Sequence, residues 1–465
     1  MIQKDFLVER KASLVAKPSK TWRVGTLRYT TGGLALLFCW LLWGDFAWSM
    51  RDRAMPPVVQ LLFRRFGASD TLVGILFASL PAGIGLILGP VISYRSDRLR
   101  SRWGRRIPFL IFPTPFIVLS MAGIAISPWI GKELHRSLGF PALTADLATL
   151  ICLSLFWSTF EISCVIANSV FGALINDVVP HSVIGRFFGL FRGFSLAAGI
   201  LLTYGILGQV ENHYVAICLG VGLLYGVGFT LMCLKVKEGE YPPPPAPVLP
   251  GNAGGFFRAV RIYFKDSLGR PYYLWFFVTT LLTGMAAGPF NLYALFYAKS
   301  IGMDLGLYFK CIAASYVVSL GLSYPLGVLV DRFHPLRVSL IVNALYALVM
   351  AWGILCVRDV ASFTHVLLAH TILSGIYFTT SASLGQRILP RSKFAEIGSA
   401  GGALCNLAGM AMPPLLGYVL DCTRHHYAYV FHASLGFAVM GTIAGFIFYR
   451  KFLALGGPDH YLAPE

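Results

Sequence analysis

The sequence has few charged residues. Asp, Glu, Lys and Arg make up 13% of its 465 residues, whereas hydrophobic side chains make up 56%. Soluble globular domains carry about 25% charged residues. The composition therefore excludes an ordinary soluble domain and predicts a membrane protein.

Several signatures of other protein classes are missing. No nucleotide-binding loop and no constellation of hydrolytic residues is visible, so we expect neither an ATP-driven pump nor an enzyme. Most of the nine cysteines fall in apolar stretches and no pair has the spacing of metal ligands. We therefore expect no disulfide framework, metal site or cofactor. The first 28 residues carry seven Lys or Arg and no apolar core, so no cleaved signal peptide is expected.

Long apolar stretches dominate the rest of the chain. A membrane-spanning helix needs about 20 mostly apolar residues. Twelve stretches meet this length, at about 30–50 (or 30–62), 70–94, 107–127, 147–176, 184–209, 213–234, 272–298, 305–330, 337–357, 363–389, 395–420 and 427–449. They predict an all-α membrane protein with twelve transmembrane helices.

The longest polar interval divides these helices six plus six. It contains KVKEGEYPPPPAPVLPGNAGG, whose proline run disfavours helix and suits an extended linker. The expected organisation is an N-terminal segment (1–29), a first six-helix bundle (30–234), a linker (235–271), a second six-helix bundle (272–449) and a C-terminal tail (450–465).

Lys and Arg residues predict the orientation. If both termini are cytoplasmic, cytoplasmic segments hold 27 of the 38 Lys and Arg residues and outer loops hold 9. Positively charged loops stay in the cytoplasm, so we expect a multi-pass protein of a bacterial-type cytoplasmic (inner) membrane. Anionic lipids of the inner leaflet account for the net charge of +17, and no nucleic acid is expected as a partner. We expect a monomer.

The two halves repeat one motif. SYRSDRLRSRWGRR (93–106) joins the second and third spans, and GVLVDRFHPLR (327–337) joins the eighth and ninth. Duplicated halves around a central site are common in secondary transporters, so the halves should be pseudo-symmetric. Their charged residues can form pairs that break and re-form as helices rock. The candidate gating residues are Asp97, Arg98, Arg102, Arg105, Arg106, Asp331 and Arg332.

Four polar residues lie inside predicted spans. Charges at mid-bilayer cost about 2.5–3.5 kcal/mol each, so they normally face the bundle interior and have partners. Arg192 and Asn168 are equally distant from the turn between the fourth and fifth spans, and Glu161 lies on the same helical face as Asn168. Asp45 comes at a comparable depth in the first span. We expect the four to line one cavity; a static ion-pair cluster is the alternative.

Other polar residues are weaker candidates. The RDR triplet at 51–53 is expected at the outer mouth, where its members can satisfy one another. His370 is expected to be a packed, hydrogen-bonded histidine.

The loop SDRLRSRWGRR resembles the signature between helices two and three of the major facilitator superfamily. FGASDTLVGILF and SRWGRRIPFLI, within residues 66–111, resemble the glycoside-pentoside-hexuronide:cation symporters, such as the melibiose carrier, and equally the plant sucrose:proton symporters. The resemblance is best from about residue 40 to 200. It implies the major facilitator fold and transport of a small molecule.

The resemblance also bears on the four intramembrane residues. NSVFGALINDVV and RFFGLFR (within 168–192) are similar to the helix four to five signature of the glycoside symporters, which implies sugar-binding roles for Asn168 and Arg192. Arg186 is a competing match for the sugar-binding arginine, although its shallow depth argues against it. GDFA (44–47) implies the same role for Asp45, and Glu161 matches an Asp in helix four of the sucrose carriers. GIGLILGPVIS (83–93) lacks the carboxylates of the melibiose carrier's sodium site, so sodium coupling there is not expected.

These observations predict a proton-coupled symporter of saccharides or glycosides. Glu161, and after it Asp45, would carry the proton; Arg192, Asn168, Asp45 and Glu161 would hold the substrate. One alternative is an organic-anion carrier with Arg192 as counter-charge. Another is a non-transporting membrane assembly factor, because the loop and topology also resemble pigment-assembly proteins.

Overall fold

The computed structural model describes residues 21–140, 142–180, 182–241, 243, 269–390 and 394–464. The N-terminal 20 residues and most of the expected linker lie outside this part. Eleven described stretches are long and apolar enough to cross a membrane, and the longest, 184–235, contains two helices. The described residues therefore form the twelve spans that the sequence predicts.

The two halves each supply six spans, some of them built from more than one helical segment. The first half contains α2 (Thr31–Arg65), α3 (Asp70–Gly74) with η1 (Ile75–Ser79) and α4 (Leu80–Arg98), α5 (Ile107–Ile111) with α6 (Pro113–Leu138), α7 (Ala145–Val178), α8 (Ile184–Gly205), and α9 (Val210–Lys235) after the short η2 (Leu207–Gln209). The second contains α11 (Pro271–Ala286) with α12 (Gly288–Ser300), α13 (Leu305–Phe333), α14 (Pro335–Cys356), α15 (Val360–Ser381) with α16 (Leu384–Ile388), α17 (Phe394–Cys422), and α18 (Tyr429–Ala454), which α19 (Gly457–His460) follows.

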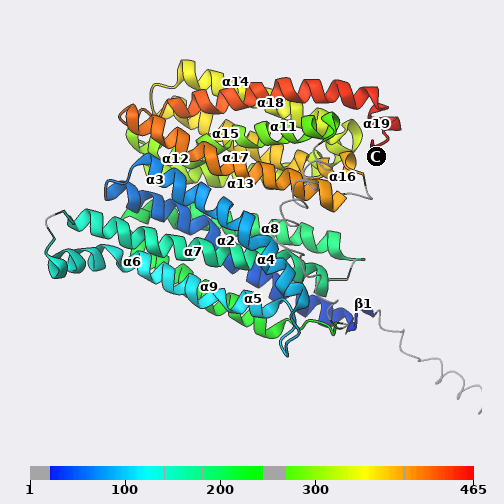
Figure 1. Cartoon of the computed structure of the whole chain (residues 1–465), viewed down its shortest axis with the longest axis horizontal. Coiled ribbons are helices and arrows are strands. Elements are labelled where there is room, and N and C mark those ends of the chain that lie inside the picture. Colours follow the sequence, from blue (N-terminus) through cyan, green and yellow to red (C-terminus); the bar gives the residue numbers. More distant parts are fainter. Residues whose placement is uncertain are drawn as a thin grey trace, which may run out of the picture.

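The halves lie side by side as two bundles (Figure 1). Within the first, α7 packs on α6 and α4, and α2 packs on α8 and α9. Between the halves, α17 packs on α3, η1 and α4, while α13 packs on α8. These two contacts join the second span to the eleventh and the fifth to the eighth, so pseudo-symmetry exchanges them.

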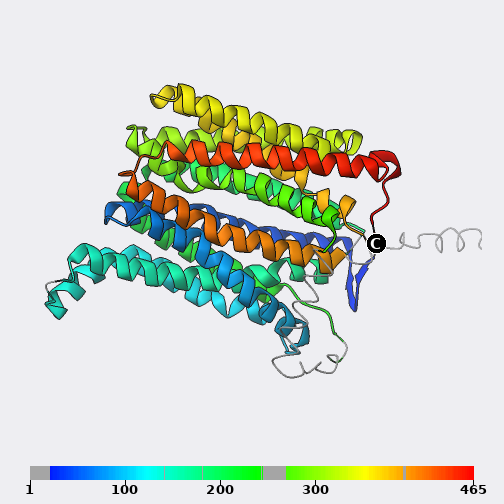
Figure 2. The ribbon, with the colours of Figure 1, turned by 45° about the horizontal axis from the view of Figure 1, so that its top comes forward.

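The two ends of the bundle differ. Figures 1 and 2 place the short N-terminal strands and the C-terminus at one end, which we call the terminal end; the opposite end is the far end. Several helices that begin at the far end have a side-chain oxygen at the N-cap, which accepts a hydrogen bond from an otherwise unpaired N–H. These N-cap residues are Ser69, Thr144, Asp304 and Asp359. In the exposed cap of α15, the hydrogen bonds from Ser362 hold the pKa of Asp359 below its ordinary value.

Glycines allow the second and eleventh spans to touch. A Cβ added at Gly74 would lie 2.6 Å from the carbonyl oxygen of Pro413, and one added at Gly417 would lie 2.5 Å from the carbonyl oxygen of Asp70. Both distances are shorter than van der Waals contact with backbone. The two halves therefore approach here as closely as their main chains permit.

A π-helical turn, η1, follows this contact directly. The N–H of Leu80 donates to the carbonyl of Ile75, so the carbonyl of Leu76 has no α-helical donor, and its π-helical partner would be Pro81, which has no N–H. The indole Nε1 of Trp157 in α7 donates to the Leu76 oxygen at 3.1 Å instead. A side chain from another span thus satisfies the backbone group that the wide turn exposes.

The first span is longer than its apolar run suggests. Helix α2 has 35 residues, and it continues through Pro56 and Pro57 to Arg65. The extension that the sequence allowed to about residue 62 is therefore present. It places residues 51–53 in the middle of a membrane-spanning helix, so their expected position at the outer mouth was wrong.

The sequence analysis missed a small hairpin before α2. Strands β1 (Trp22–Val24) and β2 (Leu27–Tyr29) pair antiparallel, and Gly25 adopts a φ of +53° in the turn. The hydroxyl of Thr26 accepts a hydrogen bond from the N–H of Glu240, beyond the end of α9. The hairpin therefore packs against the start of the expected linker.

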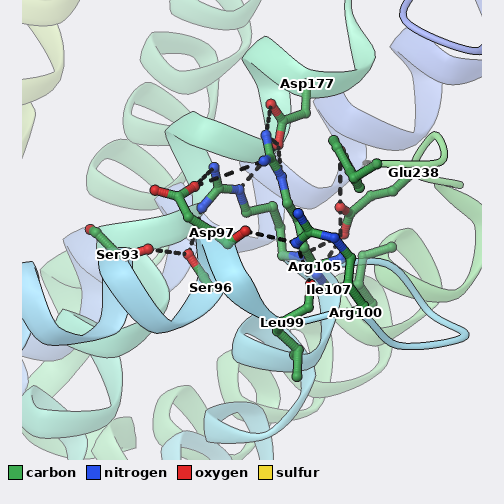
Figure 3. A network of polar contacts seen from close by, with 11 residues as sticks. Ser93, Ser96, Asp97, Leu99, Arg100, Arg105, Ile107, Asp177 and Glu238 are labelled. Atoms are coloured by element: carbon green, nitrogen blue, oxygen red, sulfur yellow. Dashed lines mark hydrogen bonds and ion pairs between the residues drawn. The ribbon is translucent and has the colours of Figure 1, made fainter. Parts of the chain in front are cut away.

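Glu238, which follows α9, bonds the start of α5 (Figure 3). Its carboxylate accepts hydrogen bonds from the backbone N–H groups of Arg105 (3.0 Å), Arg106 (2.8 Å) and Ile107 (2.8 Å). These groups lie at the start of α5, where N–H groups lack helical partners and a negative charge is favourable. Glu238 thus caps α5 from the segment that follows α9.

We expect Glu238→Ala to lower the melting temperature of the purified protein by several degrees, because a hydrogen bond to a charged group contributes about 1.5–3 kcal/mol. Differential scanning fluorimetry checks this. Glu240→Ala is the matched control, since that side chain is exposed and two residues away. Equal melting temperatures for the two variants would contradict the capping role.

Candidate functional site

A central chamber of about 780 Å³ lies between the halves. Helices α2 and α8 of the first half and α11 to α15 of the second half line it. Its wall is rich in hydroxyl, amide and ring nitrogen groups that can exchange hydrogen bonds with a polar ligand. These side chains are Gln60, Ser195, Thr283, Asn291, Tyr308, Tyr316, Ser319, Asn343, Tyr346, His370, Thr371, Ser374 and Tyr377.

Two guanidinium groups carry the charge of this chamber. Arg192 donates from Nη2 to the hydroxyl of Thr379 in α15 at 2.7 Å, so it bridges the two halves. Arg53 donates from Nη2 to Ser195 at 3.4 Å, and its guanidinium carbon lies 4.6 Å from the ring centroid of Tyr316. No Asp or Glu is among the described residues that line the chamber. The sequence analysis placed Arg53 at the outer mouth and so missed it.

A buried histidine anchors the second half of the wall. His370 is 1% exposed; Nδ1 lies 2.8 Å from the hydroxyl of Tyr346, and Nε2 lies 2.9 Å from Oδ1 of Asn291. Because an amide oxygen only accepts, Nε2 is the donor in its contact with Asn291. The expected packed, hydrogen-bonded histidine is present, and it fixes two polar side chains of the central chamber.

A smaller chamber of about 330 Å³ adjoins the central one, and the described residues that line it all belong to the first half. Asp45 and Asn168 line it together, and Arg53, Phe191 and Ser195 belong to the walls of both chambers. Asp45 is 3% exposed, and its Oδ2 has no hydrogen-bond partner. A buried carboxylate oxygen without a partner is costly unless it carries a proton or meets a ligand.

Glu161 lines a third chamber, of about 490 Å³. Its wall is mostly apolar and comes from α2, η1 and α7 of the first half and α11, α12 and α17 of the second. Gln60, Gly284 and Asn291 line this chamber and the central one. The third chamber is therefore a neighbour of the central chamber rather than a part of it.

The four predicted site residues are thus distributed over three adjoining chambers. The structure brings Asp45 and Asn168 together, places Arg192 in the central chamber, and places Glu161 in the third. Arg192 faces the interface between the halves and not lipid. No single described chamber holds all four residues, and the guanidinium of Arg192 bonds Thr379 of the other half.

The charges nearest the acidic residues come from the RDR triplet. Arg51 is fully buried and bonds Asp52 at 2.5 Å, and its guanidinium carbon lies 4.2 Å and 4.6 Å from the ring centroids of Trp48 and Tyr225. Cation–π contacts of this kind stabilise a desolvated guanidinium. The sequence signal was present, since three consecutive charges in an apolar helix are costly, but the assumed helix end hid it.

Three predicted gating residues of the first half, Asp97, Arg105 and Arg106, form one network with Asp177 at the terminal end (Figure 3). Arg106 bonds Asp97 at 2.5 Å and Asp177 at 3.1 Å, and Arg105 makes a bidentate pair with Asp177 at 2.7 and 3.0 Å. Burial lowers the pKa of Arg105, but hydrogen bonds and charge from Asp177 outweigh it and raise the pKa above its ordinary value. All these contacts stay within one half, joining α4 and α7 through the loop before α5.

The second half repeats part of this arrangement. Asp331 at the end of α13 bonds Arg387 in α16 at 2.5 Å. His334 is the N-cap of α14, and its Nδ1 accepts from the N–H of Leu336 at 3.3 Å. Burial, with charge from Arg387 and Arg337, lowers the pKa of His334 to about 4, so the imidazole is neutral as this cap requires.

The remaining predicted gating residues have aromatic neighbours. Arg98, Arg102 and Arg332 place their guanidinium carbons 4.3, 5.7 and 5.4 Å from the ring centroids of Tyr94, Trp103 and Phe333. Each of these contacts lies within one half.

Charged groups also join the halves at the far end, and the sequence analysis did not find these contacts. Asp421 accepts from the N–H groups of Asp70 (2.7 Å) and Thr71 (2.9 Å) and from the Thr71 hydroxyl (2.5 Å). Asp70 in turn meets His425 Nδ1 at 2.6 Å and the hydroxyl of Tyr427 at 3.1 Å. We call these five residues the far-end latch.

The latch also has the composition of a metal site. Asp70, Asp421 and His425 offer ligand atoms within 4.8 Å of one another. Hydrogen bonds across the interface already use the carboxylates, and the imidazole faces Asp70. The arrangement therefore accounts for these residues as a fastening between the halves.

Two six-helix bundles that meet over a polar chamber and are latched at one end define a multi-pass membrane protein of the major facilitator fold. The chain belongs to the MFS/sugar transport protein family, whose model matches residues 62–392. It is similar to sucrose transport protein SUT1 of Oryza sativa subsp. japonica, with 30% identity over 87 residues, which cover 19% of this chain and 15% of that protein. That alignment spans less than a fifth of either protein, so the family match over residues 62–392 carries the assignment.

Solved structures share the fold. A bacterial homologue of the human lysosomal transporter Spinster, in an inward-facing and unoccupied conformation, aligns with a TM-score of 0.65 and 12% identity over 94% of this chain and 100% of that one. The xylose transporter XylE from E. coli, in an inward-open conformation, aligns with a TM-score of 0.61 and 14% identity over 90% and 96% of the two chains. At these identities the likeness establishes the fold alone.

We expect Asp421→Ala to widen the far end. The substitution removes three hydrogen bonds to a carboxylate, each contributing about 1.5–3 kcal/mol. Electron–electron distance measurements between spin labels at Arg136 and Arg358, exposed residues at the far end of each half, should show a larger share of long distances. The native cysteines are replaced in this background.

Glu211→Ala is the matched control for the latch. Glu211 also forms an ion pair across the halves, with Lys299, but both side chains are exposed, so the pair contributes little. Equal distance distributions for Asp421→Ala and Glu211→Ala would contradict the role of the latch.

Proposed function

We propose that this protein carries a saccharide or glycoside across the cytoplasmic membrane by alternating access, in symport with protons. The central chamber supports this function best: it lies between the two bundles and presents hydroxyl, amide and guanidinium groups from both. A sugar offers many hydroxyl groups, and such a wall can hydrogen-bond them in a site shielded from bulk water.

In this proposal the substrate spans the central chamber and the adjoining one. Arg192 and Arg53 donate to the substrate's oxygens from the first half. On the second half, Asn291 and His370 bond each other and hold the polar wall of the chamber in place. Asp45 and Asn168 accept and donate from the side chamber, whose wall is continuous through Arg53 and Ser195. A ligand that touches both halves can draw them together, which couples binding to closure.

The coupling proton would reside on Glu161 or Asp45. Neither carboxylate forms an ion pair among the described residues, and Asp45 has a buried oxygen without a partner. Protonation removes the uncompensated charge, and a change in exposure between the two access states would release the proton on the other side. Arg192 and Glu161 line different chambers, so a proton on Glu161 would not compete with the sugar for this arginine.

The membrane and its orientation are also proposals. Loops rich in Lys and Arg at the terminal end favour cytoplasmic termini and contacts with anionic lipid headgroups. We propose a monomer. The latch would then close the outer side, and this conformation would face the cytoplasm.

A second candidate is a carrier of acidic sugars or other organic anions. The central chamber contains two guanidinium groups and no carboxylate among its described lining residues, which favours a negatively charged ligand. Membership of a sugar-transport family gives no support to the third alternative, a non-transporting assembly factor.

Proton coupling can be measured in de-energised, weakly buffered vesicles. Addition of the transported sugar should make the external medium more alkaline, because protons enter with it. Glu161→Gln should keep sugar exchange and lose proton-driven accumulation, since the amide binds no proton. The compounds to be tested include neutral sugars and uronic acids. Uptake of the acids alone would favour the organic-anion carrier.

The same assay with Asp45→Asn separates the two carboxylates. Unchanged accumulation in either variant excludes that residue as the proton site, and unchanged accumulation in both overturns proton coupling through these chambers. Absence of exchange of any sugar or acid by the wild-type protein would overturn the proposed function.

Arg192→Gln should raise KM for the transported substrate by about 10-fold or more, because a lost hydrogen bond to a charged group costs about 1.5–3 kcal/mol. Arg186→Gln is the control: this arginine lies in the same helix but is exposed and lines none of the three chambers. The reverse pattern would assign the substrate arginine to Arg186.

A further inference from the structure

The third chamber has a charge opposite to that of the central chamber. Glu161 is its one carboxylate, and no Lys, Arg or His is among the described residues that line it. No hydrogen bond or ion pair joins the side chain of Glu161 to another described residue, and this partly exposed residue lines the chamber. The chamber therefore presents a negative charge that the protein itself does not neutralise by contact.

The nearest buried cation does not supply that neutralisation. Arg51 is in electrostatic range of Glu161, but so is Asp52. Arg51 bonds Asp52 at 2.5 Å and is enclosed by aromatic rings, so the two charges offset each other. The charge of Glu161 remains for a ligand.

The rest of the wall suits an apolar body with a delocalised or alkylated positive charge. Phe77 and Trp157 stack with their ring centroids 4.6 Å apart, and Met285 and Met412 line the same space. Aromatic faces attract cations, and methionine thioethers adapt to irregular apolar shapes. Chambers of about 300–1,000 Å³ hold drug-sized ligands, and this one has about 490 Å³.

We propose that the Glu161 chamber is a separate binding site for amphipathic organic cations. A ligand would place its cationic centre against the Glu161 carboxylate and its apolar groups against Phe77, Trp157 and the two methionines. Because Gln60, Gly284 and Asn291 also line the central chamber, an occupant would lie directly beside the substrate site. The site uses a carboxylate that is also proposed to carry the coupling proton, so a bound cation would compete with a proton at Glu161. Binding is measured without transport, so the two proposals can fail separately.

The test uses two probes of the same shape and opposite charge. Equilibrium dialysis of the purified full-length protein in detergent, with a protein-free micelle blank, measures binding of tetraphenylphosphonium and tetraphenylborate. We expect saturable binding of the cation and none of the anion. Glu161→Gln should weaken cation binding by about 10-fold or more, whereas Glu161→Asp, which keeps the charge, should retain it.

A second pair of variants tests the position without altering charge. Gly409 and Gly402 both lie in α17, and a Cβ at either would meet no atom within 4 Å, but only Gly409 lines the chamber. Gly409→Leu should abolish binding of the phosphonium ion, and Gly402→Leu should leave it unchanged. Size-exclusion profiles verify that each variant is folded.

Three results would overturn the proposal. They are equal binding of the two probes, undiminished cation binding in Glu161→Gln, and undiminished cation binding in Gly409→Leu. Cation binding without sugar transport would contradict the proposed function and support this inference.

Discussion

A charged side chain inside the hydrocarbon core must find a partner within the protein, and this requirement organises the molecule. Arg51 meets it with Asp52 and two aromatic rings, in the middle of the first span. Arg53, two residues further on, meets it at the interface between the halves, where Ser195 and Tyr316 are available. Polar chambers consequently lie between the bundles, and the outer faces of the bundles are left to apolar residues.

The two ends of the interface are fastened in different ways. At the far end, charged groups and main chain from both halves interlock around Asp70 and Asp421, beside a glycine-mediated contact of the second and eleventh spans. At the terminal end, the Asp97–Arg106–Asp177 network stiffens one half internally. Stiff halves joined by a fastening of hydrogen bonds can move as rigid bodies, because such bonds exchange partners with water when the interface opens.

Much of the fold was evident from the sequence because the signals are local. Twelve apolar runs, a proline-rich interval and a repeated Asp-Arg motif predicted the spans and their grouping. The site was less accessible, since it depends on which way side chains turn. The depth of Arg192 along its helix predicted a position inside the membrane, and the structure places it in the central chamber. Depth alone could not predict that Thr379 of the other half would be its partner. The latch could not be predicted either, because its two parts lie about 350 positions apart in the chain and meet only in the folded protein.

The wide turn at Ile75–Ser79 has a consequence for the register of the second span. A π turn accommodates one more residue than an α turn, so conversion of this turn to α-helix, with every residue kept, would turn the rest of that helix by about 100° about its axis. The face of α4 that meets α17 would then swing toward the lipid. The angular phase of half a membrane span thus depends on one additional residue, whose liberated carbonyl is satisfied by the indole of Trp157.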